Sequence, residues 1–122
     1  MNLWSDFFEI ISVEGNQSKF SAVIEFNPGH EIFKGHFPGK PVVPGVCMVQ
    51  IIKDLLKKIF DKDFTMKQAS QLKFLAIVNP NENKTVNVDL AILKDDTEGL
   101  VVSGSFNKGE LVFLKYKATF IA

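Results

Sequence analysis

Several features that would assign a chain to a particular class of protein are scarce in this sequence of 122 residues. The single cysteine, Cys47, excludes an internal disulfide and fits a reducing compartment. No cluster of side chains has the spacing of a metal site. No stretch approaches the ~18 apolar residues of a membrane-spanning helix, and the N-terminus lacks the basic region of a signal peptide. We therefore expect a cytoplasmic protein without a metal and without a membrane partner.

An excess of charge of either sign is also missing. Basic and acidic residues both number 14, so the formal net charge is zero, and the two signs are interspersed. This pattern gives no basic stripe for nucleic acid and no polybasic patch for a membrane surface. The hydrophobic content of 46% and the charged content of 23% are ordinary for a globular chain. The length predicts a single domain over residues 1–122.

Alternating apolar residues predict an antiparallel sheet with one apolar face. In "SKFSAVIEF" the apolar residues occupy every second position. The alternation predicts strands with the apolar faces Phe20, Ala22, Ile24, Phe26; Leu72, Phe74, Ala76, Val78; Val86, Val88, Leu90, Ile92; Leu100, Val102, Phe106; and Val112, Leu114, Tyr116, Ala118, Phe120. A shorter strand is expected in "FFEIISV", and turn signals at 79–83, 95–99 and 107–109 separate the later runs.

One segment can cover the apolar face of this sheet. Pro44 suits the first turn of a helix, and apolar residues follow it at helical spacing, namely Val46, Val49, Ile52, Leu55, Leu56, Ile59 and Phe60. The early part, "VCMVQII", is apolar nearly all round, as expected of a helix wrapped by a sheet. A central helix at about residues 44–60 followed by four antiparallel strands is the element order of a hotdog fold, an α+β architecture.

The segment "GHFPGKPVVPGV", residues 35–46, resembles the active-site motif of the hotdog-fold 3-hydroxyacyl-acyl-carrier-protein dehydratases. "LKFLAIVNPNENKTV" is a weaker match to the strand and turn that such enzymes carry. The resemblance implies dehydration of a 3-hydroxyacyl thioester to the trans-2-enoyl thioester. It also implies a substrate on a phosphopantetheine arm, of acyl carrier protein or of coenzyme A, with no further cofactor. The expected assembly is a homodimer or a higher multiple, with active sites at the interface.

His36 suits the role of the base in such a reaction. Elimination of water needs a base for the proton beside the thioester carbonyl, and a neutral imidazole is available near neutral pH. The stiff frame of Gly35, Phe37 and Pro38 restricts the motion of the imidazole. We expect these three residues to contact the substrate. Taken alone, a histidine between glycine and phenylalanine is more often a turn residue, but the surrounding motif favours catalysis.

The start of the predicted helix offers a second part of the site. Backbone N–H groups near Gly45 and Val46 could polarise the thioester carbonyl, and a glycine at 45 lets a ligand approach the backbone closely. Pro44, Gly45 and Val46 are therefore expected to bind substrate.

Gln50 departs from the family pattern. Members of the family place a glutamate or aspartate fourteen positions after the histidine, where this chain has Gln50, and often place a glutamine four residues later, where it has Asp54. An amide cannot protonate a leaving hydroxyl. Asp54 could act as the acid through a water, or Gln50 could orient a water, or the chain could have lost dehydration. We favour Gln50 as the site residue, with Asp54 as the less favoured acid.

Two other functions fit the same residues. A hotdog acyl thioesterase hydrolyses the same class of thioester, and some resemble this chain in using an amide to position water. A non-catalytic hotdog subunit that binds an acyl carrier is the other, although the retained His36 argues against it. His30 is expected to be a loop residue, Cys47 a small buried hydrophobe, and Lys40 a weak candidate contact for an acidic carrier protein.

Overall fold

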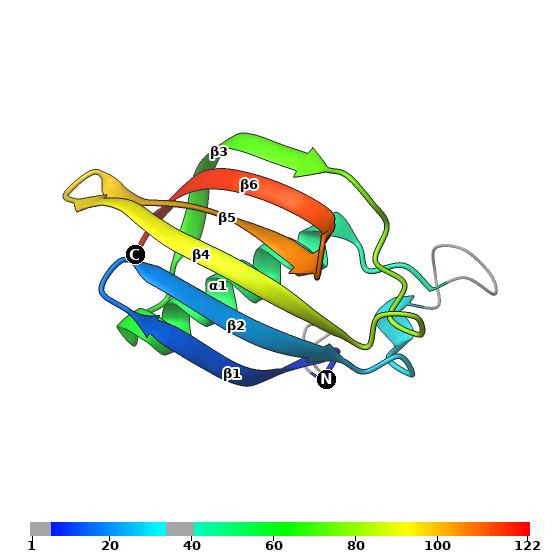
Figure 1. Cartoon of the computed structure of the whole chain (residues 1–122). Coiled ribbons are helices and arrows are strands. Elements are labelled where there is room, and N and C mark those ends of the chain that lie inside the picture. The colour runs from blue at the N-terminus through cyan, green and yellow to red at the C-terminus, as the bar shows by residue number, and fades with distance from the viewer. Residues whose placement is uncertain (1–5, 34–40) are drawn as a thin grey trace.

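The computed structural model describes residues 6–33 and 41–122, and it has one long helix and a curved sheet (Figure 1). The elements are β1 (Phe8–Asn16), β2 (Lys19–Phe26), the 3-10 turn η1 (Glu31–Phe33), α1 (Gly45–Phe60), β3 (Thr65–Phe74), β4 (Thr85–Asp96), β5 (Gly99–Lys108) and β6 (Leu111–Ile121). Among the described residues, no helix is long and apolar enough to cross a membrane.

The six strands form one antiparallel sheet in the order β1-β2-β4-β5-β6-β3. Figure 1 shows α1 lying across the concave face of this sheet. The order places β1 and β3 at the two edges, and it separates β3 from β4, its neighbour in sequence, by two strands. The expected hotdog fold is confirmed.

The core forms between α1 and the concave face, as the alternating pattern predicts. Its sheet side consists of Ala22, Ile24, Phe26, Val86, Val88, Leu90, Leu100, Val102, Phe106, Leu114, Tyr116, Ala118 and Phe120. Its helix side consists of Cys47, Met48, Ile51, Ile52, Leu55 and Leu56. The hydroxyl of Tyr116 donates a hydrogen bond to the backbone oxygen of Asp89 at 2.8 Å, so this buried phenol is satisfied inside the sheet.

The prediction for β3 was wrong in its bounds and its face. The strand begins at Thr65 and ends at Phe74, so Ala76 and Val78 lie beyond it. Leu72 and Phe74 are 36% and 53% exposed instead of facing the core. Backbone pairing with β6 holds this strand at the edge of the sheet, and almost all of its side chains are exposed.

Helix α1 begins at Gly45, directly after Pro44 in the N-cap position, and ends at Phe60. Asp61 follows in the left-handed conformation and donates its backbone N–H to the oxygen of Lys57 at 2.7 Å, which caps the last turn. Val46 belongs to the apolar spacing of the helix but does not face the sheet, because its side chain is 63% exposed. Cys47 and Met48 face the sheet in its place, which leaves Val46 on the outer face of the helix.

Candidate functional site

The central motif residues Gly35, His36, Phe37 and Pro38 lie outside the described residues, and so does Lys40. Their roles stay predictions. The described part of the predicted site consists of the start of α1 and the pair Gln50 and Asp54.

An apolar pocket of about 520 Å³ opens beside the first turn of α1. Its lining comes from the helix start and from the chain around the end of β3, namely Val42, Val43, Pro44, Gly45, Met48, Phe74, Leu75, Ala76, Ile77 and Val78. The backbone N–H of Val43 donates to the oxygen of Val78 at 2.9 Å and joins these two walls. Among the residues that the structure describes, none of those lining the pocket carries an N–H or O–H group in its side chain, so their polar contacts to a ligand would come from the backbone.

The first turn of α1 supplies such backbone groups. Cys47 and Met48 both direct their N–H groups to the oxygen of Pro44, at 3.0 and 3.3 Å. Gly45 and Val46 come earlier in the turn, where a helix offers no acceptor of its own. The N-terminal end of a helix also carries a partial positive charge. An apolar wall beside two amide donors suits a ligand that combines a hydrocarbon chain with a carbonyl oxygen.

Gln50 and Asp54 contact each other directly on α1. The side-chain Nε2 of Gln50 donates to Oδ1 of Asp54 at 2.8 Å, and both residues are half-buried. This confirms the shared helix face that their spacing predicts. The contact holds the nitrogen of the amide toward the carboxyl group, which leaves its second N–H and its oxygen for another partner.

The pair does not line the pocket at the helix start. At about 100° per residue, Gln50 lies about 140° around the helix axis from Gly45. It instead shares a face with the exposed Val46 and with Asp54, at successive four-residue steps. One chain therefore presents its helix-start pocket and its Gln50–Asp54 pair on different sides of α1.

Cys47 and His30 are two further side chains with reactive groups, and their surroundings indicate structural roles. Cys47 is fully buried, and burial raises the pKa of its thiol to about 11, so the nucleophilic thiolate is disfavoured at neutral pH. His30 lies in the loop after β2, where its Nδ1 accepts the backbone N–H of Ile32 at 3.0 Å. Its ring lies edge-on to Phe7 and Phe33. The predictions of a buried Cys47 and a loop His30 are confirmed.

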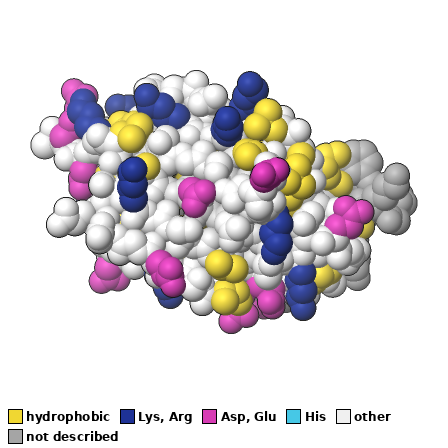
Figure 2. All heavy atoms as spheres, in the orientation of Figure 1, with side chains coloured by type: hydrophobic (Ala, Val, Ile, Leu, Met, Phe, Trp, Pro, Cys, Tyr) yellow, Lys and Arg dark blue, Asp and Glu magenta, His cyan; other side chains and the backbone are white. Residues whose placement is uncertain are grey.

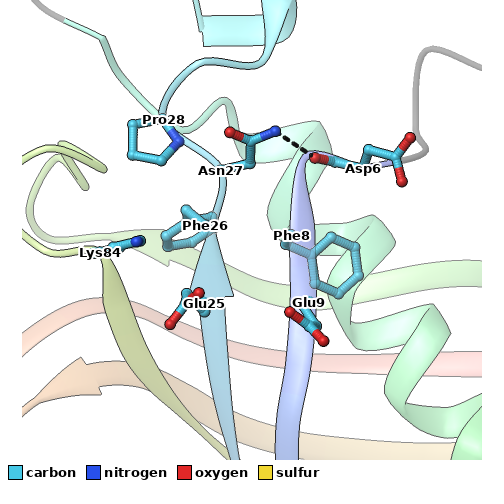
Figure 3. Close-up of a pocket in the computed structure, with 8 residues that line it drawn as sticks. All are labelled: Asp6, Phe8, Glu9, Glu25, Phe26, Asn27, Pro28 and Lys84. Carbon is cyan, nitrogen blue, oxygen red and sulfur yellow. Dashed lines mark hydrogen bonds between the residues drawn. The ribbon is translucent and has the colours of Figure 1, made fainter.

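A second pocket, of about 510 Å³, lies where β1 begins and β2 ends (Figure 3). Its size does not distinguish it from the first, but its lining does, because it carries the carboxyl groups of Asp6, Glu9 and Glu25 beside Lys84. Glu9 and Glu25 are direct partners in the β1–β2 ladder. None of the predicted site residues that the structure describes lines this pocket. In the described ranges, no group of three or more His, Cys, Asp or Glu could hold a metal ion.

Sequence reasoning missed the role of the chain around the end of β3. Phe74, Leu75 and Ile77 are large, apolar and 53%, 45% and 68% exposed, and all three line the pocket at the helix start. Figure 2 shows hydrophobic side chains gathered over this end of the molecule. The signal was present in "FLAIV", where consecutive apolar residues break the alternation of a half-buried strand.

Comparison with known proteins gives matches at the levels of family, sequence and structure. A model of the ApeI-like family, described as ApeI dehydratase, matches residues 12–105. A 3-hydroxyacyl-(acyl-carrier-protein) dehydratase FabZ of Oenococcus oeni is 38% identical over 73 residues, which cover 54% of this chain and 52% of the relative. The FabZ of Clostridium acetobutylicum is 30% identical over 78 residues, covering 58% and 54%. The chain thus spans about half the length of these curated relatives.

Solved structures share the fold. The dehydratase heterocomplex ApeI:P from Xenorhabdus doucetiae contains a chain that superposes with a TM-score of 0.76 at 16% identity, over 93% of this chain and 97% of that one. An uncharacterised protein from Erwinia carotovora gives a TM-score of 0.68 at 20% identity, over 93% and 92%. At these identities the likeness supports the fold alone.

Proposed function

Because the chain belongs to the ApeI-like dehydratase family, whose model covers residues 12–105, we propose that it converts a 3-hydroxyacyl thioester to the trans-2-enoyl thioester. The observation that carries the proposal is the pocket at the start of α1, where apolar side chains lie beside Gly45 in the first turn of the helix. This combination matches an acyl chain that ends in a thioester carbonyl.

The proposed reaction is an elimination. His36 removes the proton from the carbon beside the carbonyl, and negative charge develops on the carbonyl oxygen. The amides of Gly45 and Val46 stabilise that charge, since donors fixed before the reaction act most strongly where charge develops. The bond from the third carbon to the hydroxyl then breaks, and the hydroxyl leaves as water after it receives a proton. The role of His36 rests on the motif around it.

Gln50 and Asp54 together provide the hydrogen-bonding group for the leaving hydroxyl. The carboxyl of Asp54 fixes the Gln50 amide at 2.8 Å, and the free N–H of that amide can donate to the hydroxyl. The amide cannot transfer a proton, so the proton comes from water that it orients or from Asp54 through such a water. We favour Gln50 as the contact to the hydroxyl, with Asp54 as its support.

The protein works as a homodimer, or a multiple of one, in this proposal. Val46 is 63% exposed on the same face of α1 as Gln50 and Asp54, and an exposed apolar face favours association. The edge strand β3 is also unpaired on one side in the single chain. Since Gln50 faces away from its own helix-start pocket, a second copy would supply that group to the pocket.

The substrate arm is phosphopantetheine, either on acyl carrier protein or in coenzyme A, and the chain needs no cofactor of its own. The carrier protein is the stronger candidate, because the curated relatives are named for it. We place the reaction in the cytoplasm, whose reducing conditions suit the single Cys47.

One assay separates this function from its alternatives. The purified protein is incubated with 3-hydroxyacyl and with saturated acyl pantetheine thioesters, and mass spectrometry follows enoyl product and free thiol separately. Enoyl product from the hydroxyacyl thioester supports dehydration. Free thiol without enoyl product would instead establish the thioesterase. If neither product forms, the result supports the non-catalytic subunit.

A further inference from the structure

The contact between Phe74 and Gly45 points to a residue that controls entry to the site. We propose that the Phe74 ring covers the first turn of α1 in the free protein and rotates outward to admit the acyl thioester. The inference rests on the proposed function, because that function defines the ligand. It assigns to Phe74 a part in substrate access that neither the motif nor its catalytic residues include.

The ring lies where a side chain at position 45 would lie. A methyl group built on Gly45 would meet Cζ of Phe74 at 2.8 Å, Cε1 at 3.2 Å and Cε2 at 3.7 Å. The three nearest atoms are those at the tip of the ring, so the tip points at the Gly45 backbone. The contact depends on the absence of a Cβ, because real Cβ atoms do not approach other atoms to 2.8 Å.

This position obstructs the ligand that the pocket suits. A thioester carbonyl that accepts a hydrogen bond from the first turn of α1 must come close to the Gly45 backbone. The ring tip already occupies one side of that backbone and forms part of the pocket wall. Substrate and ring therefore compete for the same space beside the helix start.

The ring can move at little cost. Phe74 is the last residue of β3, where the ladder with β6 ends at Leu114. Its side chain is 53% exposed, so about half of its surface already contacts water. Fully buried phenylalanines such as Phe106 and Phe113 have no comparable freedom. A half-exposed ring at a strand end can change its rotamer without opening the core.

The first experiment measures ligand association with the assembled protein. A 3-hydroxyacyl pantetheine amide, which cannot be hydrolysed as a thioester, is immobilised, and the association rate constant is measured for each variant. If a minor open state of about 10% or less admits the ligand, Phe74→Ala should raise the association rate about tenfold or more. Phe74→Leu should raise it less, and Phe74→Trp should lower it. Leu93→Ala is the matched control, because Leu93 is 54% exposed and does not line the pocket.

The second experiment is a double-mutant cycle on the contact itself. Gly45→Ala improves helix propensity, but its methyl group requires the Phe74 ring to shift. The thermal unfolding temperature should therefore rise less on Gly45→Ala in the unmodified background than in the Phe74→Ala background. An equal change in both backgrounds, or association rates for the Phe74 variants within twofold of the unmodified protein, would overturn the inference. Failure of the amide to bind any variant would overturn it too.

The two experiments separate this inference from the proposed reaction. Binding of the amide requires no turnover, so the access role can hold in a protein that yields no enoyl product. Conversely, enoyl formation at a rate insensitive to Phe74 would support dehydration and remove Phe74 from it.

Discussion

Replacement of Gln50 by glutamate tests the proposed chemistry most directly. The substitution is nearly isosteric, so the new carboxyl group would lie about where the amide now donates to Asp54 at 2.8 Å. Two negative charges at that distance repel by about 1.5 kcal/mol in water and by about 6 kcal/mol at an effective dielectric constant of 20. The pair is half-buried, so the repulsion falls between these limits.

This repulsion keeps a proton on the pair. At 1.36 kcal/mol per unit, it corresponds to a rise of about one to four units in the pKa of the introduced carboxyl. Gln50→Glu therefore adds a group that can protonate the leaving hydroxyl below about pH 6. We expect the rate of enoyl formation to rise about tenfold or more at pH 5–6, the lower part of the range for a general acid. The gain should disappear as the pH rises and the carboxyl ionises.

Thermal unfolding across the same pH range independently checks that the pKa of the introduced carboxyl is raised and not lowered. A carboxyl whose pKa is higher in the folded state stabilises the fold at low pH and loses that contribution as the pH rises through the folded pKa. Gln50→Glu should thus unfold at a lower temperature at pH 8 than at pH 5, relative to the unmodified protein. A variant with neither a pH-dependent gain in enoyl formation nor this loss of stability would refute the reasoning from the 2.8 Å contact.

Three further predictions concern the base, the assembly and the core. His36→Ala should lower turnover by ~10²–10⁴-fold with the fold intact by circular dichroism; full turnover would exclude His36 as the base. Light scattering at micromolar concentration should give a dimer or a multiple of it, and Val46→Asp should weaken the assembly; a strict monomer would contradict the proposed interface. Tyr116→Phe should cost about 1–2 kcal/mol of unfolding free energy, because it leaves the Asp89 oxygen without its 2.8 Å donor; an unchanged denaturation midpoint would contradict this.

The strands that bury one face against the core and expose the other could be predicted from the sequence. In β2 and β4 every second residue meets the helix, so the burial repeats the alternation of the sequence. Strand β3 could not be predicted in this way. Its backbone pairs with β6 while its side chains stay in water, so "TMKQASQ" carries no apolar pattern. The apolar run that follows indicated a strand but lines the pocket instead.

The candidate site likewise has one contact that the sequence could predict and one that it could not. Gln50 and Asp54 are four residues apart on one helix, and that spacing alone predicts their contact. The contact of Phe74 with Gly45 joins two elements that are distant in sequence, and it depends on where the end of β3 meets the start of α1. The spacing of residues within one segment carries no information about a contact between two distant segments. The glycine itself nevertheless indicated a close approach to the backbone.

Gln50→Glu both places an acid at position 50 and adds a negative charge. Reversal of the pair, in Gln50→Glu/Asp54→Gln, places the acid there without adding the charge, so it tests the effect of position alone. The double variant keeps one carboxyl, one amide and the net charge, and an amide donor can still reach the carboxylate across one helical turn. It moves the carboxyl by about 6 Å along the axis, to where the family motif has it. Without a second carboxylate beside it, the group should ionise at lower pH than in Gln50→Glu.

The pH profiles of the two variants then locate the acid. If the leaving hydroxyl lies at position 50, both variants should form enoyl product faster than the unmodified protein near pH 5. The gain of Gln50→Glu should persist to a higher pH than that of the reversed pair before it disappears. If Asp54 already protonates the hydroxyl, the reversed pair should lose most activity at every pH, because an amide stands in its place. Equal rates in all three proteins would remove this face of α1 from the mechanism.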